Sequence, residues 1–314
     1  MTLDPQAAAV VEALGRRPGA RAADEVTVSE ARARTRGLIG LQAAPQPVAM
    51  VQGAVVPGSG RRARVYYPAG EAPFGCLVLL HGGGWVTGDL DTHDRPARRL
   101  ANASGCAVVT VDYRRAPEHP FPVPLDDCLE AIRWVGRESG RLGIDPSRIG
   151  VAGDSAGGNL AAAACLRARD EGGPDVAFQA LIYPVTDAAC ATSSYDAYRT
   201  GYGLRRDTMT WYWKHYLGGG ADGAHPYASP LRAADLSGLP PAFVATAECD
   251  PVRDDGELYA ARLAEAGVPV THRRYSGMIH AFFLMDGVLD RTAVLIEETA
   301  REAARTLMPS NPPL

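Results

Sequence analysis

The five residues GDSAG at positions 153–157 constrain the fold of this chain more than any other segment. The apolar run Ile149–Ala152 precedes them and the alanine-rich run Leu160–Leu166 follows, which predicts a buried strand and then a helix. A serine between a strand and a helix occupies a sharp turn, where flanking glycines let neighbouring backbone pass without a clash. Ser155 would then stand at a helix N-terminus, where backbone N–H groups stabilise negative charge. The segment therefore predicts a nucleophilic serine at the end of a sheet strand.

Apolar runs and helical patterns alternate along most of the chain, which predicts a mostly parallel central sheet with helices on both faces. The expected strands, of which the first two are antiparallel, are Val51–Val56, Arg64–Tyr67, Cys76–Leu80, Cys106–Val111, Ile149–Ala152, Ala177–Tyr183, Ala242–Ala247 and Val270–Tyr275. Besides the helix after Ser155, the expected helices of this alternation are Arg95–Ala103, Leu125–Arg141, Asp254–Ala266 and Leu289–Leu307.

The N-terminal residues precede any strand and carry helix signals. Asp4 as N-cap and Pro5 as first helical residue predict one helix. Thr27 and Glu30 form a capping-box pattern that predicts a second helix, which ends near Ile39.

A second helical segment interrupts the alternation after the sixth expected strand. Its helix, Arg206–Leu217, carries the aromatic residues Trp211, Trp213 and Tyr216. Because the N-terminal helices are too short to be stable alone, we expect them to pack on this aromatic face and roof a ligand site. The alternative is a surface helix whose aromatic face packs on the body of the protein. The resulting division is residues 1–45 for N-terminal cap helices, 46–186 for the first part of the core, 187–238 for a helical cap insertion and 239–314 for the second part of the core.

A nucleophilic serine needs a base and a group that orients the base. Of seven histidines, His280 alone lies just after a late expected strand, so it faces the same crevice as Ser155. Asp250 directly follows the preceding expected strand, whereas Asp254 and Asp255 come later, where we expect them to cap the next helix. The chain order is then serine, aspartate, histidine, which is the order of α/β-hydrolases.

A glycine run, HGGGW at residues 81–85, follows the third expected strand. Consecutive glycines let a loop turn its N–H groups toward one point, where the negative oxygen of a tetrahedral intermediate would form. The alternative is a phosphate-binding loop, but the run lacks the lysine of a Walker loop and the spacing of a dinucleotide site.

With these residues in view, the chain resembles the bacterial hormone-sensitive-lipase-like esterases of the α/β-hydrolase superfamily. The resemblance spans essentially the whole chain and is carried by residues 81–85, YRRAPEHPFP at 113–122, GDSAGGN at 153–159, DPVRDDG at 250–256 and GMIH at 277–280. It implies an α/β-hydrolase fold with a helical cap, and a structural role for residues 113–122.

The resemblance also implies roles for single residues. The N–H groups of Gly83, Gly84 and Ala156 would form the oxyanion hole, and His81 would orient the glycine loop. One departure is visible: Ala281 follows the histidine, where the family often has glycine. The candidates for the substrate pocket are Trp85, Tyr183 and Trp213.

The expected reaction is hydrolysis of carboxylic esters with short to medium acyl chains, through an acyl-enzyme on Ser155 that needs Asp250 and His280 but no metal or cofactor. Two alternatives stay open. The same residues could serve a deacetylase or amide hydrolase of secondary metabolism, and a non-catalytic ligand receptor could share the fold.

Composition excludes other partner classes. The net charge of −4 shows no bias toward nucleic acid or anionic membranes, and no apolar run reaches transmembrane length. The six cysteines are scattered without a C-x-x-C pair, and the N-terminus lacks a signal-peptide pattern, which favours a reduced cytoplasmic protein. The expected reaction makes a small-molecule ester its partner. The sequence leaves open whether the chain forms a homodimer.

Overall fold

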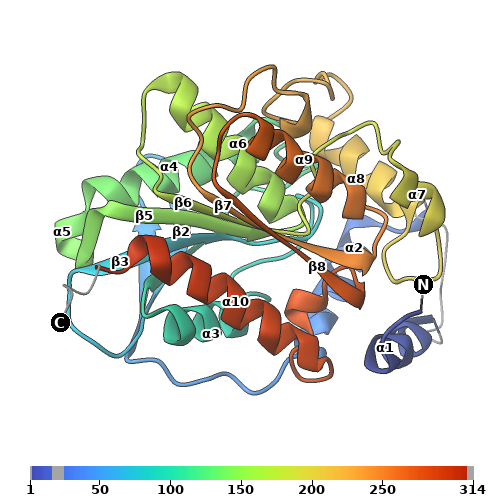
Figure 1. The fold of residues 1–314 in the computed structure, drawn as a ribbon, viewed down its shortest axis with the longest axis horizontal. Coiled ribbons are helices and arrows are strands. Elements are labelled where there is room, and N and C mark those ends of the chain that lie inside the picture. The colour runs from blue at the N-terminus through green and yellow to red at the C-terminus, as the bar shows by residue number, and fades with distance from the viewer. Residues whose placement is uncertain (1, 16–24, 310–314) are drawn as a thin grey trace.

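The computed structural model describes residues 2–15 and 25–309, which contain an eight-stranded sheet between two layers of helices (Figure 1). The strand order is β1-β2-β4-β3-β5-β6-β7-β8. The strands β3 to β8 pair in parallel, and β2 pairs antiparallel with both β1 and β4. The strands are β1 (Met50–Val56), β2 (Arg61–Tyr67), β3 (Phe74–Leu80), β4 (Ala107–Val111), β5 (Ile144–Asp154), β6 (Phe178–Ile182), β7 (Ala242–Cys249) and β8 (Val270–Ile279).

Helices cover both faces of this sheet. On one face α4, α6 and α9 pack over a core that is continuous with α8, and on the other α3 and α10 pack side by side (Figure 1). The helices are α1 (Pro5–Gly15), α2 (Val28–Arg36), α3 (Asp94–Ser104), α4 (Val123–Arg137), α5 (Ser139–Leu142), α6 (Ala156–Glu171), α7 (Ser193–Ala197), α8 (Arg206–Leu217), α9 (Arg253–Glu265) and α10 (Asp290–Leu307). Three short 3₁₀ turns, η2 (Gly37–Leu41), η3 (Pro230–Arg232) and η4 (Phe282–Leu284), complete the described elements. The predicted α/β fold class is confirmed.

Several predicted boundaries differ from the observed ones, because pairing with a neighbour extends a strand beyond its apolar run. The strand expected at Val270–Tyr275 continues to Ile279, where it pairs with Cys249 of β7 after a register shift. The helix expected at Leu125–Arg141 is divided into α4 and α5 at Glu138.

The N-terminal segment (residues 2–15 and 25–45) begins its helices as predicted. The Asp4 carboxylate accepts from the backbone N–H of Gln6 at 2.9 Å, and Pro5 starts α1. Both halves of the capping box are present at α2, since the Thr27 hydroxyl accepts from the N–H of Glu30 and the Glu30 carboxylate accepts from the N–H of Thr27. Within the described residues, no helix combines the length and the apolar character that crossing a membrane requires.

The turn between β5 and α6 combines an unusual backbone conformation with close backbone contacts. Ser155 has φ 56° and ψ −117°, a conformation that L-residues rarely adopt. A Cβ atom on Gly157 would lie 2.0 Å from the carbonyl oxygen of Leu80, at the end of β3, and one on Gly153 would lie 2.2 Å from the carbonyl oxygen of Gly157. The glycines therefore let α6 start directly against β3.

We expect Gly157→Ala to lower the free energy of unfolding by at least about 1–3 kcal/mol, because its methyl group overlaps backbone that cannot move aside. Gly140→Ala in α5 is the matched control, since nothing lies within 4 Å of its Cβ position and its φ is negative. Urea unfolding of both variants measures the difference. Equal stabilities would show that the turn between β5 and α6 has room for a side chain.

Candidate active site

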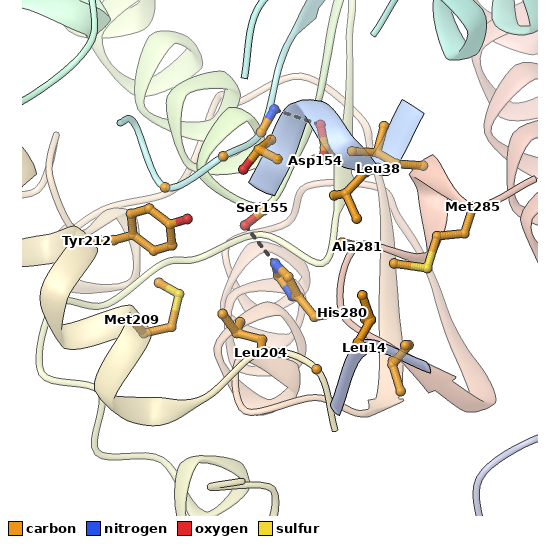
Figure 2. Close-up of a pocket in the computed structure, with 17 residues that line it drawn as sticks. Leu14, Leu38, Asp154, Ser155, Leu204, Met209, Tyr212, His280, Ala281 and Met285 are labelled. Atoms are coloured by element: carbon orange, nitrogen blue, oxygen red, sulfur yellow. Dashed lines mark hydrogen bonds between the residues drawn. The ribbon is translucent and has the colours of Figure 1, made fainter. Parts of the chain in front are cut away.

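A hydrogen-bonded chain of three side chains lies at the carboxyl edge of the sheet. Figure 2 shows the bond of this chain between Ser155 and His280. The Ser155 Oγ lies 2.8 Å from Nε2 of His280, and Nδ1 of His280 lies 2.7 Å from Oδ2 of Asp250. The exposed fractions are 7% for Ser155, 8% for His280 and 0% for Asp250. A proton on Nδ1 faces the carboxylate, so Nε2 is left to accept the serine proton. The structure thus brings together the three residues that the sequence singled out.

The pairing of β7 with β8 places the acid beside the base. Cys249 and Ile279 are the last paired residues of the two strands, so the residues that follow them, Asp250 and His280, emerge side by side. The backbone N–H of Val252 donates to Oδ1 of Asp250 at 3.0 Å, which leaves Oδ2 for the histidine.

The two neighbouring aspartates do not cap α9, so that expectation is wrong. Val252 is the N-cap of this helix and makes no side-chain cap bond. The Asp254 carboxylate accepts from the N–H of Ser194 at 2.8 Å. Asp255 is fully buried, and its carboxyl accepts from the hydroxyl of Thr192 at 3.3 Å. Both carboxyls instead hold the start of residues 187–238 against the core.

The glycine loop and Ser155 line the same cavity. Gly83 and Gly84, with φ of 117° and 58°, line the same cavity as Ser155 and His280. In the part of the chain that the structure describes, the N–H groups of these two glycines donate to no protein acceptor. Ala156 is the first residue of α6, where N–H groups have no partner within the helix. Three donors are therefore free to bind an oxyanion near Ser155.

A second buried aspartate–histidine pair lies behind the serine, and the sequence reasoning missed it. Oδ1 of Asp154 accepts from Nε2 of His93 and from the N–H of Gly82, each at 2.8 Å. Burial acts to raise the pKa of Asp154, but attraction to His93 and these hydrogen bonds outweigh it and lower the pKa. Through these bonds, Asp154 connects the turn that carries Ser155 to the glycine loop. His93 lies before α3 and no local pattern marks it, so only the position of Asp154 inside the serine motif hinted at a role.

His81 is unsuited to act as the base. Its ring is buried, stacks on Tyr113 at a centroid distance of 4.0 Å, and bonds through Nδ1 to the carbonyl of Gly82 at 2.9 Å. Burial, together with repulsion from His93, lowers its pKa to about 4. The ring is thus in contact with the glycine loop through Gly82, and its orienting role stays a prediction.

A cavity of about 190 Å³ adjoins Ser155 and is lined mainly by apolar side chains. Figure 2 shows Met209 and Tyr212 of α8 on one side of Ser155, and Leu38 and Met285 on the other. The further apolar side chains of the lining are Leu14, Leu204, Ile279, Ala281 and Leu284. Ala281 adopts φ 64°, a left-handed conformation that explains why glycine suits this position, and here its methyl group faces the cavity.

The N-terminal segment and the insertion (residues 187–238) both line the cavity, but the insertion does so with other residues than expected. Trp213 packs on Trp85 at a ring distance of 4.4 Å, and Tyr216 stacks on Trp85 at 4.3 Å, inside the core. Tyr183 is also fully buried, with its ring 4.7 Å from that of His280. Trp85, Tyr183 and Trp213 are therefore not among the residues that line the cavity, and Tyr212 takes their place.

Among residues 2–15 and 25–309, no group of three or more histidine, cysteine or acidic side chains is arranged to hold a metal ion. All six cysteines are buried and free of disulfides.

Known proteins share this sequence and geometry. Residues 77–284 match a family model described as an alpha/beta hydrolase fold. The chain is similar to carboxylesterase NlhH of Mycobacterium tuberculosis, with 47% identity over 223 residues that cover 70% of each protein. It is also similar to an ethyl acetate hydrolase of Pseudomonas putida, with 39% identity over 248 residues, 76% of this chain and 77% of the relative.

Solved structures agree over nearly the whole chain. A hyperthermophilic esterase from the archaeon Pyrobaculum calidifontis has a TM-score of 0.91 and 40% identity, and the match covers 97% of this chain and 99% of the other. A thermostable esterase from Pseudomonas putida has a TM-score of 0.92 and 34% identity, with 98% and 99% covered.

Asp255 should make the stability of the protein depend on pH. Burial raises the pKa of its carboxyl to about 8, well above the value in an unfolded chain. The folded state then holds a proton that the unfolded state releases, so this contribution is complete at low pH and is lost as the pH rises toward about 8. The free energy of unfolding of Asp255→Asn minus that of wild type should therefore increase as the pH rises from about 5 to about 8. The increase is at most about 1.4 kcal/mol per pH unit. Urea unfolding at several pH values measures it, and a constant difference would contradict the protonated state.

Proposed function

The chain belongs to the hormone-sensitive-lipase-like esterases of the α/β-hydrolase family, and on this premise we propose that it hydrolyses carboxylic esters through a covalent acyl-enzyme on Ser155. The observation that carries the proposal is the hydrogen-bonded chain from Ser155 through His280 to Asp250, with free N–H groups beside it. The esterases and carboxylesterases among its relatives support the ester as the bond that is cleaved.

The first half of the reaction acylates the serine. Nε2 of His280 takes the hydroxyl proton as Oγ of Ser155 attacks the ester carbonyl, and Asp250 stabilises the imidazolium. The N–H groups of Gly83 and Gly84, with that of Ala156, would bind the negative oxygen of the tetrahedral intermediate. His280 then gives its proton to the departing alcohol.

The second half releases the acid. A water molecule loses a proton to His280 and attacks the acyl carbonyl, and the second intermediate collapses to the carboxylic acid and free Ser155. Every step uses side chains and backbone groups of this chain. An amide hydrolase would use the same groups, and an intact set of three argues against a receptor without catalysis.

The cavity supports a preference for short to medium acyl chains. Its volume is about 190 Å³, and Leu14, Thr35, Gly203 and Tyr212 separate it from a second cavity of about 400 Å³. We propose that the N-terminal segment and the insertion act as a cap over this cavity. A reducing cytoplasm as the location fits the free cysteines and stays part of the proposal.

Replacing the serine tests the proposed function. Ser155→Ala should lower kcat for p-nitrophenyl butyrate by on the order of 10⁴–10⁶-fold, because no covalent intermediate can form. Ser147→Ala, an exposed serine on the same strand β5, should retain wild-type activity. A Ser155→Ala enzyme with more than about a tenth of the wild-type kcat would refute the assignment.

The boundary between the two cavities should set the length of acyl chain that the enzyme prefers. Leu14→Ala removes a side chain that lines both cavities, so longer acyl chains gain room to enter the second one. The ratio of kcat/KM for p-nitrophenyl hexanoate to that for the butyrate should rise by about fourfold for each methylene that becomes buried, from about 0.8 kcal/mol per group.

Val11→Ala is the matched control for Leu14→Ala, since Val11 lies on the same helix but lines only the second cavity. Its ratio for the two esters should equal that of wild type. If Leu14→Ala left the ratio unchanged as well, Leu14 would not be the barrier.

A further inference from the structure

The carbonyl oxygen of Gly83 is held from one side by three hydrogen bonds. It accepts from the N–H of Thr87 at 2.8 Å, from the N–H of Val86 at 3.2 Å and from the hydroxyl of Thr87 at 2.9 Å. A Cβ atom on Gly83 would lie 2.5 Å from both oxygens of Thr87, so this contact is as close as the backbone permits. The orientation of the Gly83 carbonyl is therefore fixed by Thr87.

Holding this carbonyl also aims an N–H group. The peptide unit that joins Gly83 to Gly84 is planar and trans, so the N–H of Gly84 points away from the carbonyl of Gly83. With the carbonyl directed at Thr87, the N–H is directed away from Thr87, and both glycines line the cavity beside Ser155. A rotation of this one peptide would remove a donor from the proposed oxyanion hole.

Thr87 is in turn held from the N-terminal segment. The hydroxyl of Thr35, in the last turn of α2, donates to the hydroxyl of Thr87 at 2.9 Å. Each hydroxyl in this chain donates to the next oxygen, from Thr35 to Thr87 to Gly83, and such chains strengthen their members. Arg32, one turn earlier, donates to the carbonyl of Val86 at 3.0 Å. Helix α2 therefore contacts the two residues that directly follow the glycine run, Val86 and Thr87.

Tyr212, which belongs to the insertion, also contacts the glycine loop. A Cβ atom on Gly84 would lie 2.2 Å from the Tyr212 ring, so the ring packs directly on the Gly84 backbone. Tyr212 and Thr35 also line the same two cavities, so the ring lies near α2 as well as near the glycine run. The glycine loop is thus held between residues from two distant parts of the chain.

We propose that Thr35 is a positioning residue of the oxyanion hole: its hydroxyl orders Thr87, which holds the Gly83 carbonyl and so aims the Gly84 N–H at the reacting carbonyl. The inference rests on the proposed function, since it assumes that the glycine loop binds the oxyanion. It assigns part of the rate of the chemical step to a helix that contributes no catalytic residue. A cavity-lining role alone would affect substrate binding instead.

Two substitutions of one residue separate these roles. Thr35→Val keeps the shape of the side chain and removes the hydroxyl, whereas Thr35→Ser keeps the hydroxyl and removes the methyl group. With p-nitrophenyl butyrate, Thr35→Val should lower kcat by about tenfold with KM changed less than about twofold. The loss should be smaller than the 10²–10³-fold caused by removing an oxyanion-hole donor, because Gly84 itself remains. Thr35→Ser should recover most of the wild-type kcat.

A reversible trifluoromethyl ketone gives a readout that packing would not move. It forms a tetrahedral adduct with an active serine, and its negative oxygen occupies the oxyanion hole. Its affinity should fall in Thr35→Val by the same factor as kcat. Thr210→Val, on the exposed face of α8, controls for a general effect of removing a threonine hydroxyl and should match wild type in both measurements.

The outcomes are distinct. A rise in KM alone, or an equal loss of kcat in the valine and serine variants, would overturn the positioning role. Should Thr35→Val fail to fold in a thermal unfolding control, Thr35→Ala takes its place with the same expected loss of kcat. A wild-type protein without esterase activity would refute the proposed function, whereas an active wild type with an unaffected Thr35→Val would refute only this inference.

Discussion

The close contact between the start of α6 and the end of β3 is the constraint on which the site depends. At Gly157 the helix backbone touches the carbonyl of Leu80, so the turn that carries Ser155 and the loop that begins at His81 occupy fixed relative positions. The Asp154 carboxylate reinforces this contact by accepting from the N–H of Gly82. Ser155 follows β5 and the glycine donors of the proposed oxyanion hole follow β3, so these groups can act on one carbonyl only because the two backbones meet.

Two buried aspartate–histidine pairs serve this arrangement in different ways. Asp250 pairs with a histidine that reaches Ser155, so its charge acts on the reacting group. Asp154 pairs with His93, and its carboxylate also accepts from the backbone N–H of Gly82 in the glycine loop. Both carboxylates keep hydrogen-bond partners in the core, which is the condition under which a buried charge is tolerated.

The N-terminal segment and the insertion line the cavity and also contact residues at the glycine run. Leu14, Leu38 and Met209 line the cavity that we propose for the acyl chain, while Thr35 contacts Thr87 and Tyr212 contacts Gly84. Specificity and rate would then draw on the same two segments. This coupling follows from packing, because the three consecutive glycines 82–84 have no side chains to keep their peptides in place.

The sequence by itself determined the fold class and the residues of the hydrogen-bonded chain. Apolar runs that end in a polar residue mark the carboxyl ends of parallel strands, and these ends meet at one edge, so Ser155, Asp250 and His280 could be placed together from local patterns.

The tertiary structure alone decided which side chains line the cavity. Helix α8 carries aromatic residues on several faces, so its periodicity does not tell which face turns inward. Packing on Trp85 draws Trp213 into the core, and Tyr212 is left to face Gly84. The pair of His93 with Asp154 also lay beyond sequence reasoning, because His93 does not follow an expected strand and no local pattern marks it. Contacts of this kind depend on how elements pack against one another, and a local pattern carries no information about that.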